Sequence, residues 1–147
     1  MKNFYLQTLP RVVLGALFLV ASIDGFAYVF SGSHLIHPST SASGLAFEDA
    51  LKASDFFWPF LKTIELVGAL CLLTNRAPAF GLVLLAPVMS VIVLFHLVLN
   101  PGGLLMALLL VVCGGLLVYA NAPRFLTLFK PGDRVFSDRR RTLASSR

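Results

Sequence analysis

The chain has 147 residues, of which 57% are hydrophobic and 13% charged, and its mean hydropathy is +0.84. A composition this apolar excludes a water-soluble globular domain and predicts an integral membrane protein. The formal net charge of +5 comes from basic residues at the ends of apolar segments and in the tail, a pattern of membrane topology and not of nucleic-acid binding.

Four apolar segments each approach the roughly 20 residues that an α-helix needs to cross a bilayer. They comprise residues 12–30, 57–74, 80–99 and 103–120. The short connections NRAPA and NPGG favour antiparallel hairpins between neighbouring spans. The expected fold is all-α, an integral membrane four-helix bundle over residues 1–125, followed by a basic cytoplasmic tail over residues 126–147.

The segment between the first two spans begins as a polar loop and continues as FEDALKASDFF, in which apolar residues recur at helical spacing beside charged ones. This pattern predicts a short interfacial helix that joins the second span near Trp58 and Pro59. His34 and His37 in the loop have the i,i+3 spacing of a metal pair, but the loop is polar and irregular, so we expect no metal site.

Lysines and arginines near the span ends indicate the topology, because their translocation across a membrane is disfavoured. Those on one side are Lys2, Arg11, Arg76, Arg124, Lys130, Arg134 and residues 139–141. We expect this side to be cytoplasmic, with both termini inside the cell. For the tail, we favour contact with anionic lipid headgroups over a protein-docking motif.

Four ionisable residues lie within the spans, where a charge costs roughly 2.5–3.5 kcal/mol at a helix centre. They are Asp24, Lys62, Glu65 and His96. At 1.5 Å per residue, all four lie about 17–24 Å from the cytoplasmic edge, at nearly one level in the outer half. One hypothesis is a convergent ligand-binding or proton-handling site that opens outward. The alternative is an internal Lys62–Glu65 pair, with Asp24 pairing across, that binds nothing.

Other residues of the spans leave narrower questions. For His96, a structural imidazole and a proton carrier are equal alternatives. Gly68 follows Glu65 by one turn and predicts close approach of another helix, whereas Pro87 either bends the third span or is simply tolerated. Cys71 and Cys113 lie in different spans without a C-x-x-C pattern, so we expect no dithiol centre and no covalently bound cofactor.

Three stretches carry a resemblance to a known family: an arginine before LGALFLVASIDGF, then KTIELVGALCLL followed by an arginine, and APVMSVIVLFH. Over roughly residues 8–125 the chain resembles the DoxX family of small four-helix bacterial membrane proteins. The family pattern places its polar marks on Arg11, Gly15, Lys62, Glu65, Gly68, Pro87 and His96. Many members have a lysine or another polar residue where this chain has Asp24, an acid that can pair with Lys62.

The resemblance implies an accessory or quinone-interacting subunit of a membrane redox system in the bacterial inner membrane. Lys62, Glu65 and His96 would contact the quinone headgroup or move its protons. Such a chain would need a protein partner or a diffusible quinone to do redox chemistry. We expect no enzyme activity of the chain by itself, and the alternative is activity as part of a quinone-linked oxidoreductase complex. The alternative is a non-catalytic scaffold, assembly factor or chaperone; a small transporter ranks last, because no inverted repeat is visible. The oligomeric state, including a homo-oligomer, is left open.

Overall fold

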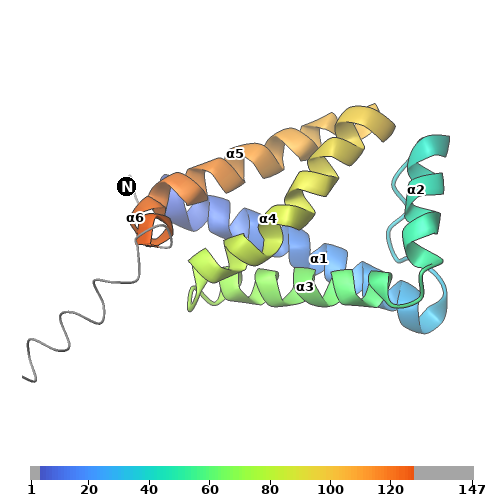
Figure 1. Ribbon diagram of the computed structural model, residues 1–147, viewed down its shortest axis with the longest axis horizontal. Helices are drawn as coiled ribbons and strands as arrows, with labels where there is room; N and C mark the ends of the chain where they lie inside the picture. The colour runs from blue at the N-terminus through green and yellow to red at the C-terminus, as the bar shows by residue number, and fades with distance from the viewer. Residues whose placement is uncertain (1–3, 128–147) are drawn as a thin grey trace, which may run out of the picture.

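The computed structural model describes residues 4–127, and each regular element in this range is a helix (Figure 1). In chain order they are a π-helical turn Phe4–Thr8, α1 Leu9–Ser31, α2 Ala42–Lys52, α3 Phe57–Leu73, α4 Pro78–Leu94, a π-helical turn Phe95–Leu99, a 3-10 turn Pro101–Gly103, α5 Leu104–Ala120 and α6 Ala122–Leu126. The prediction of an all-α fold is confirmed. The basic tail predicted over residues 126–147 lies outside the described residues from residue 128 onward.

Three helical segments of the described chain are long and apolar enough to span a membrane, namely Phe4–Ser31, Pro78–Leu99 and Pro101–Ala120. The helix α3 has 17 residues and qualifies only together with α2, which it meets at a bend of 96°. The chain therefore has three candidate spans, or four if the bent pair counts as one. As predicted, a short helix precedes Trp58, although it begins earlier than the amphipathic pattern indicates, at Ala42.

Prolines and left-handed residues mark the helix ends. Pro10 lies in the first turn of α1, and Gly32 follows its last residue with φ 75°, donating its N–H to the Tyr28 carbonyl over 2.8 Å. Asn75 has φ 57° just after α3, and Pro78 then opens α4. These residues explain why the chain reverses within a few positions between α3 and α4.

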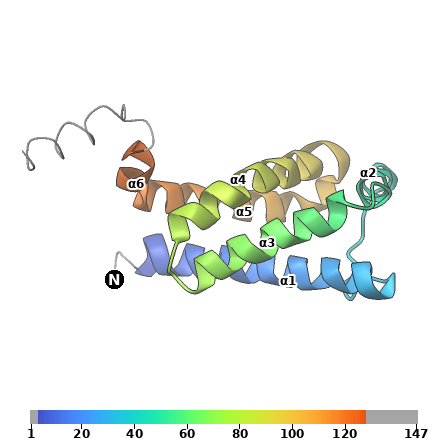
Figure 2. The same ribbon diagram turned by 60° about the horizontal axis from the view of Figure 1, so that its bottom comes forward.

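One core joins the four long helices. The helix α1 packs along α3 and against α5, while α4 packs against both α3 and α5 (Figure 2). Each of these helices contributes one fully buried leucine, and these are Leu14, Leu72, Leu85 and Leu117. The helices are therefore held in place by a shared apolar interior that runs between them.

The helix α4 runs through Pro87 without ending there. It continues as the π-helical turn around His96, which closes where the Asn100 N–H donates to the Phe95 carbonyl over 2.9 Å. The helix therefore continues past Pro87, and the irregular backbone begins eight residues later, about two turns further along.

Gly68 allows α3 and α4 to approach closely. A Cβ atom at this position would lie 2.5 Å from Cγ of Leu85, a side chain that is fully buried. Because Leu85 has no free space to move into, the contact requires glycine. The close approach predicted from the small residues after Glu65 is found here.

We expect Gly68→Ala to destabilise the protein and Gly115→Ala to be neutral or slightly stabilising. The new methyl group at position 68 overlaps Leu85, at a cost of about 1–3 kcal/mol. At position 115 nothing lies within 4 Å of the new Cβ, and alanine favours a helix by up to about 1 kcal/mol. Thermal unfolding of the purified protein in detergent compares the two, and equal midpoints would contradict the packing described here.

Candidate functional site

Lys62 and Glu65 form a buried ion pair on α3. Nζ of Lys62 lies 2.9 Å from Oε2 of Glu65, and the two residues are only 8% and 2% exposed. A spacing of three residues places both side chains on one face of the helix. Since a buried charge that loses its partner costs several kcal/mol, the two charges depend on each other.

Gly25 of α1 makes room for the lysine of this pair. A Cβ atom at Gly25 would lie 2.2 Å from Cδ of Lys62. The aliphatic part of Lys62 therefore crosses α1 at the one point where that helix presents no side chain to it. This contact brings Lys62 next to the turn of α1 that carries Asp24.

Two lysine ammonium groups lie near the ring of Trp58, at the start of α3. The distance to the ring centroid is 4.7 Å from Nζ of Lys62 and 5.1 Å from Nζ of Lys52, which is the last residue of α2. Nζ of Lys52 also lies 4.9 Å from the centroid of the Tyr28 ring. Each such cation–π contact is worth about 0.5–2 kcal/mol, so the aromatic rings stabilise two positive charges in one place.

Asp24 holds the loop that follows α1. Its Oδ1 accepts hydrogen bonds from the backbone N–H groups of Leu35 (2.7 Å) and Ile36 (2.9 Å), and its Oδ2 lies 2.6 Å from Nδ1 of His34. The partner of Asp24 is therefore a loop histidine, and the expected pairing of Asp24 with Lys62 is not formed. The loop folds back onto its own helix, because three donors within it converge on one carboxylate.

The ring of His34 lies between the loop and the tryptophan. It stacks on the Tyr28 ring at 4.7 Å and meets the Trp58 ring nearly edge-on at 6.0 Å. Through these contacts Asp24 and His34 are joined to Trp58 and, beyond it, to Lys62 and Glu65. We name the set Asp24, Tyr28, His34, Lys52, Trp58, Lys62 and Glu65 the Trp58 cluster.

Two ring nitrogens of the Trp58 cluster are buried without a hydrogen-bond partner among residues 4–127, Nε1 of Trp58 and Nε2 of His34. Buried polar atoms in native proteins are nearly always paired, so each unpaired atom needs an explanation. Nε1 of Trp58 can only donate. When the N–H at Nδ1 of His34 donates its hydrogen bond to the Asp24 carboxylate, Nε2 is an acceptor in the neutral ring and a donor in the protonated ring.

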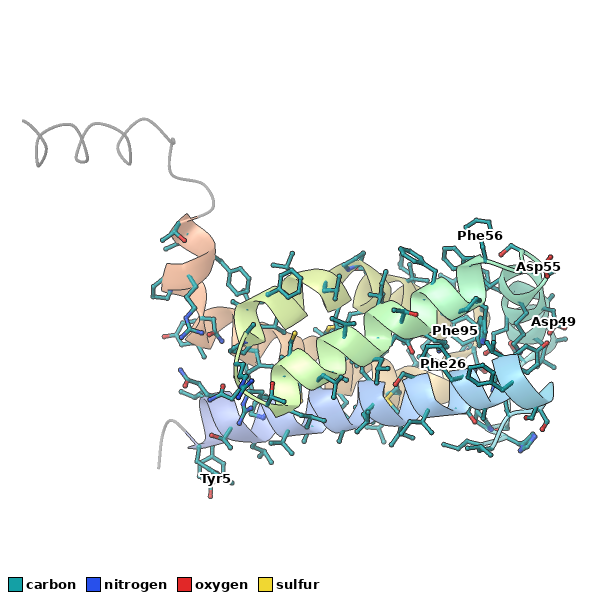
Figure 3. All side chains as sticks on the ribbon, turned by 90° about the horizontal axis from the view of Figure 1, so that it is seen from below. Tyr5, Phe26, Asp49, Asp55, Phe56 and Phe95 are labelled. Atoms are coloured by element: carbon teal, nitrogen blue, oxygen red, sulfur yellow. The ribbon has the colours of Figure 1, made fainter. Side chains whose placement is uncertain are left out.

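The Trp58 cluster lies at the end of the molecule where α2 crosses. Asp49 and Asp55 also lie at this end, and Tyr5 lies at the opposite end (Figure 3). The first turn of α2 is fixed there by the hydroxyls of Ser41 and Ser43, which both donate to the Leu99 carbonyl. The cluster is therefore covered by a helix that is attached at its start by hydrogen bonds.

The four residues predicted to form one site do not all meet. Lys62 and Glu65 are in direct contact, and Asp24 reaches them only through His34 and Trp58. His96 forms no hydrogen bond or ion pair with any of the other three in the described chain. Its Nδ1 faces the Asn100 carbonyl at 3.3 Å and packs against Gly103, which supports the structural alternative for this residue.

Sequence reasoning did not find four members of the Trp58 cluster. The sequence pattern assigns Trp58 to the junction between the interfacial helix and the second span and His34 to a polar loop, and it assigns no role in a site to Tyr28 or Lys52. A signal was available in the lone tryptophan of the chain, which stands one turn before Lys62 on the same helix face. His34 carried no such signal, because the fold-back of a ten-residue loop segment onto Asp24 has no local pattern.

Comparisons of the chain with known protein families, with curated proteins and with solved structures found no match. The site is therefore interpreted from its own geometry and chemistry.

We expect Lys62→Met and Glu65→Leu each to lower the free energy of unfolding by about 3 kcal/mol, because each leaves one buried charge unpaired. The double variant should lose less than the sum, since it removes both charges. A double-mutant cycle by thermal or denaturant unfolding in detergent measures this coupling. The same cycle on Glu48 and Lys52, 3.5 Å apart on α2, is the control and should give under about 1 kcal/mol. Additive losses for Lys62 and Glu65 would contradict a buried, mutually dependent pair.

Proposed function

We propose that this chain is a DoxX-type protein of the bacterial inner membrane, a four-helix bundle of antiparallel spans with both termini in the cytoplasm. Within it, the Trp58 cluster binds the headgroup of a quinone, and the chain acts as an accessory subunit of a membrane redox system. The sequence stretches around Asp24, Lys62 and His96 support the family, and the candidate spans support the membrane setting.

The observation that carries the quinone proposal is the pair of unpartnered ring nitrogens. Nε1 of Trp58 and Nε2 of His34 are both buried, and both belong to rings in contact with each other. A ligand that places one acceptor and one exchangeable proton between them satisfies both atoms. Quinones and quinols have this character, since their ring oxygens are carbonyls in one state and hydroxyls in the other.

The hydrogen bonds follow from the donor and acceptor types. A quinone carbonyl accepts from Nε1–H of Trp58, and a quinol hydroxyl donates to Nε2 of neutral His34. The ammonium groups of Lys52 and Lys62 lie 5.1 and 4.7 Å from the centroid of the Trp58 ring. Their positive charges favour negative charge on a ligand oxygen bound beside that ring. Asp24 stabilises the imidazolium that forms when His34 takes the proton.

Oxidation of a bound quinol requires a protein partner that accepts its electrons. When a quinol is oxidised, two electrons pass to a redox protein partner, one proton passes to Nε2 of His34 and the other to the aqueous phase. Reduction runs the same steps in reverse. The sequence has no cofactor-ligand motif of its own, so we assign the electron-carrying centre to the partner.

The lone tryptophan makes this proposal measurable, because fluorescence excited selectively at tryptophan, and not at the tyrosines, reports on Trp58 alone. We expect a short-chain quinone added to the purified protein in detergent to quench this fluorescence saturably. His34→Ala removes one hydrogen bond to the ligand and should weaken the apparent Kd by about tenfold. His37→Ala, three residues along the same loop and exposed, is the matched control and should leave the Kd unchanged.

Quenching that does not saturate, or that responds equally to the two histidine variants, would overturn quinone binding at the Trp58 cluster. Saturable quenching with a Kd that is weakened in His34→Ala and unchanged in His37→Ala supports it. The titration uses ligand binding alone, so it does not require the redox partner.

A second candidate function is favoured by a separate feature, an apolar groove between α4 and α5. The groove has a volume of about 470 Å³ and includes the small residues Ala86, Ser90, Gly114 and Gly115. Small residues let helix backbones approach closely within a bilayer. This surface suits one transmembrane helix of a partner protein, which is what a scaffold or assembly factor requires.

We expect Gly115→Leu to block this groove without disturbing the fold, because nothing lies within 4 Å of a Cβ at this position. A photo-crosslinker at Ser90, on the groove, should yield a discrete adduct in native membranes that Gly115→Leu abolishes. Gly102→Leu adds the same side chain outside the groove, where a new Cβ would meet only Oδ1 of Asn100 at 3.9 Å, and should leave the adduct intact. Equal adduct yields in all three proteins would argue against a partner helix in the groove.

A further inference from the structure

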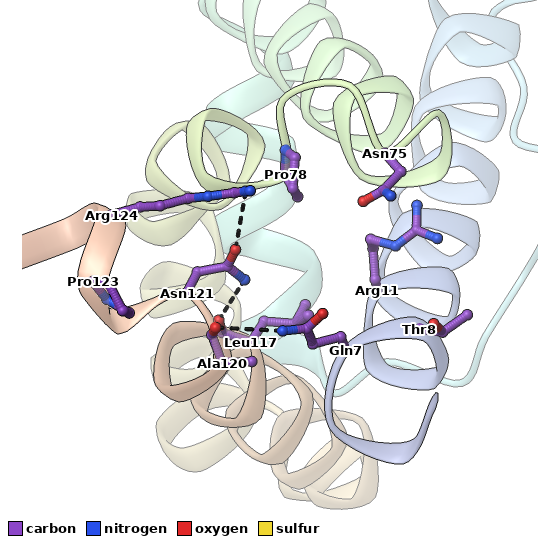
Figure 4. Close-up of a pocket in the computed structure, with 10 residues that line it drawn as sticks. All are labelled: Gln7, Thr8, Arg11, Asn75, Pro78, Leu117, Ala120, Asn121, Pro123 and Arg124. Carbon is purple, nitrogen blue, oxygen red and sulfur yellow. Dashed lines mark hydrogen bonds between the residues drawn. The ribbon is translucent and has the colours of Figure 1, made fainter. Parts of the chain in front are cut away.

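A second polar site lies at the opposite end of the molecule from the Trp58 cluster. It is a pocket of about 260 Å³ where the start of α1, the turn between α3 and α4, and the passage from α5 to α6 come together (Figure 4). Its polar lining includes Gln7, Arg11, Asn75, Asn121 and Arg124. The volume is below that of most drug-sized ligand sites, so the pocket suits one small polar group.

Two guanidinium groups reach the pocket from different elements. Arg11 extends from α1 and Arg124 from α6, on opposite sides of the opening in Figure 4. None of the lining residues is acidic, and neither arginine forms an ion pair with a carboxylate within residues 4–127. The pocket therefore carries two positive charges without a counter-charge from the described chain.

Hydrogen bonds hold both arginines in position while leaving donors free. Nη1 of Arg11 donates to the carbonyls of Leu72 and Leu73 at the end of α3. Nη1 of Arg124 donates to Oδ1 of Asn121 over 3.3 Å. Each guanidinium has five N–H donors in a planar fork, so donors remain for a ligand. The arginines are thus prepared for a ligand, and little side-chain freedom is lost when one binds.

Neighbouring groups add to the attraction for an anion. Nδ2 of Asn121 donates to the Leu117 carbonyl over 2.8 Å, which fixes the amide that positions Arg124. Pro78, in the first turn of α4, also lines the pocket, and this helix start has no side-chain cap. The positive end of the α4 dipole therefore lies beside the pocket.

We propose that this pocket binds the phosphate group of an anionic membrane phospholipid. Two guanidinium forks match the tetrahedral oxygens of a phosphate, and charge-assisted hydrogen bonds of this kind are about twice as strong as neutral ones. The lipid is favoured over free phosphate because the pocket lies at the ends of the apolar helices, where lipid headgroups meet a membrane-spanning protein. This site is separate from the Trp58 cluster in ligand and in place.

The test measures binding of three ligands to the full-length protein in a neutral detergent, by native mass spectrometry and by thermal stabilisation. The ligands are phosphatidic acid, zwitterionic phosphatidylcholine and inorganic phosphate. We expect phosphatidic acid to bind at least about tenfold more tightly than either of the others. Inorganic phosphate that binds as tightly as phosphatidic acid would overturn the assignment to a lipid, and equal binding of the two lipids would overturn the assignment to an anionic headgroup.

Variants test the location. Arg124→Gln should weaken phosphatidic acid binding by about tenfold or more, since it removes a charged donor. Arg76→Gln is the matched control. Arg76 is exposed in the turn after α3 and does not line the pocket, so its loss should change binding less than twofold. Asn75→Asp keeps the size of a side chain on the pocket and adds a negative charge, so it should weaken binding without altering the fold. Equal losses for Arg124→Gln and Arg76→Gln, or no effect of Asn75→Asp, would overturn the proposed pocket.

Discussion

The burial of Lys62 and Glu65 side by side on α3 constrains the helices around them. Two charges that lie almost wholly inside an apolar protein are tolerated only when each is the partner of the other. The pair therefore orients α3, because rotation of the helix would turn a charge toward apolar surroundings. The pair also limits which residue of α1 can face the Lys62 side chain. That residue is Gly25, because a Cβ atom there would overlap Lys62.

The same pair accounts for the aromatic site above it. The ammonium of Lys62 extends to the ring of Trp58, and that ring in turn meets His34, which Asp24 holds from the loop. The site thus contains two acid–base pairs, Asp24 with His34 and Lys62 with Glu65, and the ring of Trp58 contacts both of them. At the other end of the molecule, Arg11 and Arg124 have no acidic partner in the described chain, and carbonyl and amide oxygens position them instead. The two ends therefore differ in charge balance, because the basic groups of the Trp58 cluster have acidic partners and the two arginines have none among the described residues.

Much of the fold could be predicted from the sequence, because long apolar runs and helix-stopping residues are local signals. Pro78 and the NPGG turn mark helix ends that the structure places within a few residues of the prediction. The site was predicted less well. Glu65 and Lys62 share a face by spacing alone, whereas the partner of Asp24 is ten residues away in an irregular loop, and no periodicity indicates it. Depth along the spans concerns height alone, so it could not indicate that His96 faces Asn100.

The sequence by itself determined the all-α class, the positions of the apolar helices and the pairing of Lys62 with Glu65, since these depend on composition and on the 3.6-residue period. Only the tertiary structure decided which residues surround that pair. Tyr28, His34 and Lys52 come to Trp58 from α1, a loop and α2. Arg11 and Arg124 line one pocket although more than a hundred residues of chain separate them. Rotation of each helix about its axis and the path of each loop are set by packing, and packing depends on contacts between distant parts of the chain.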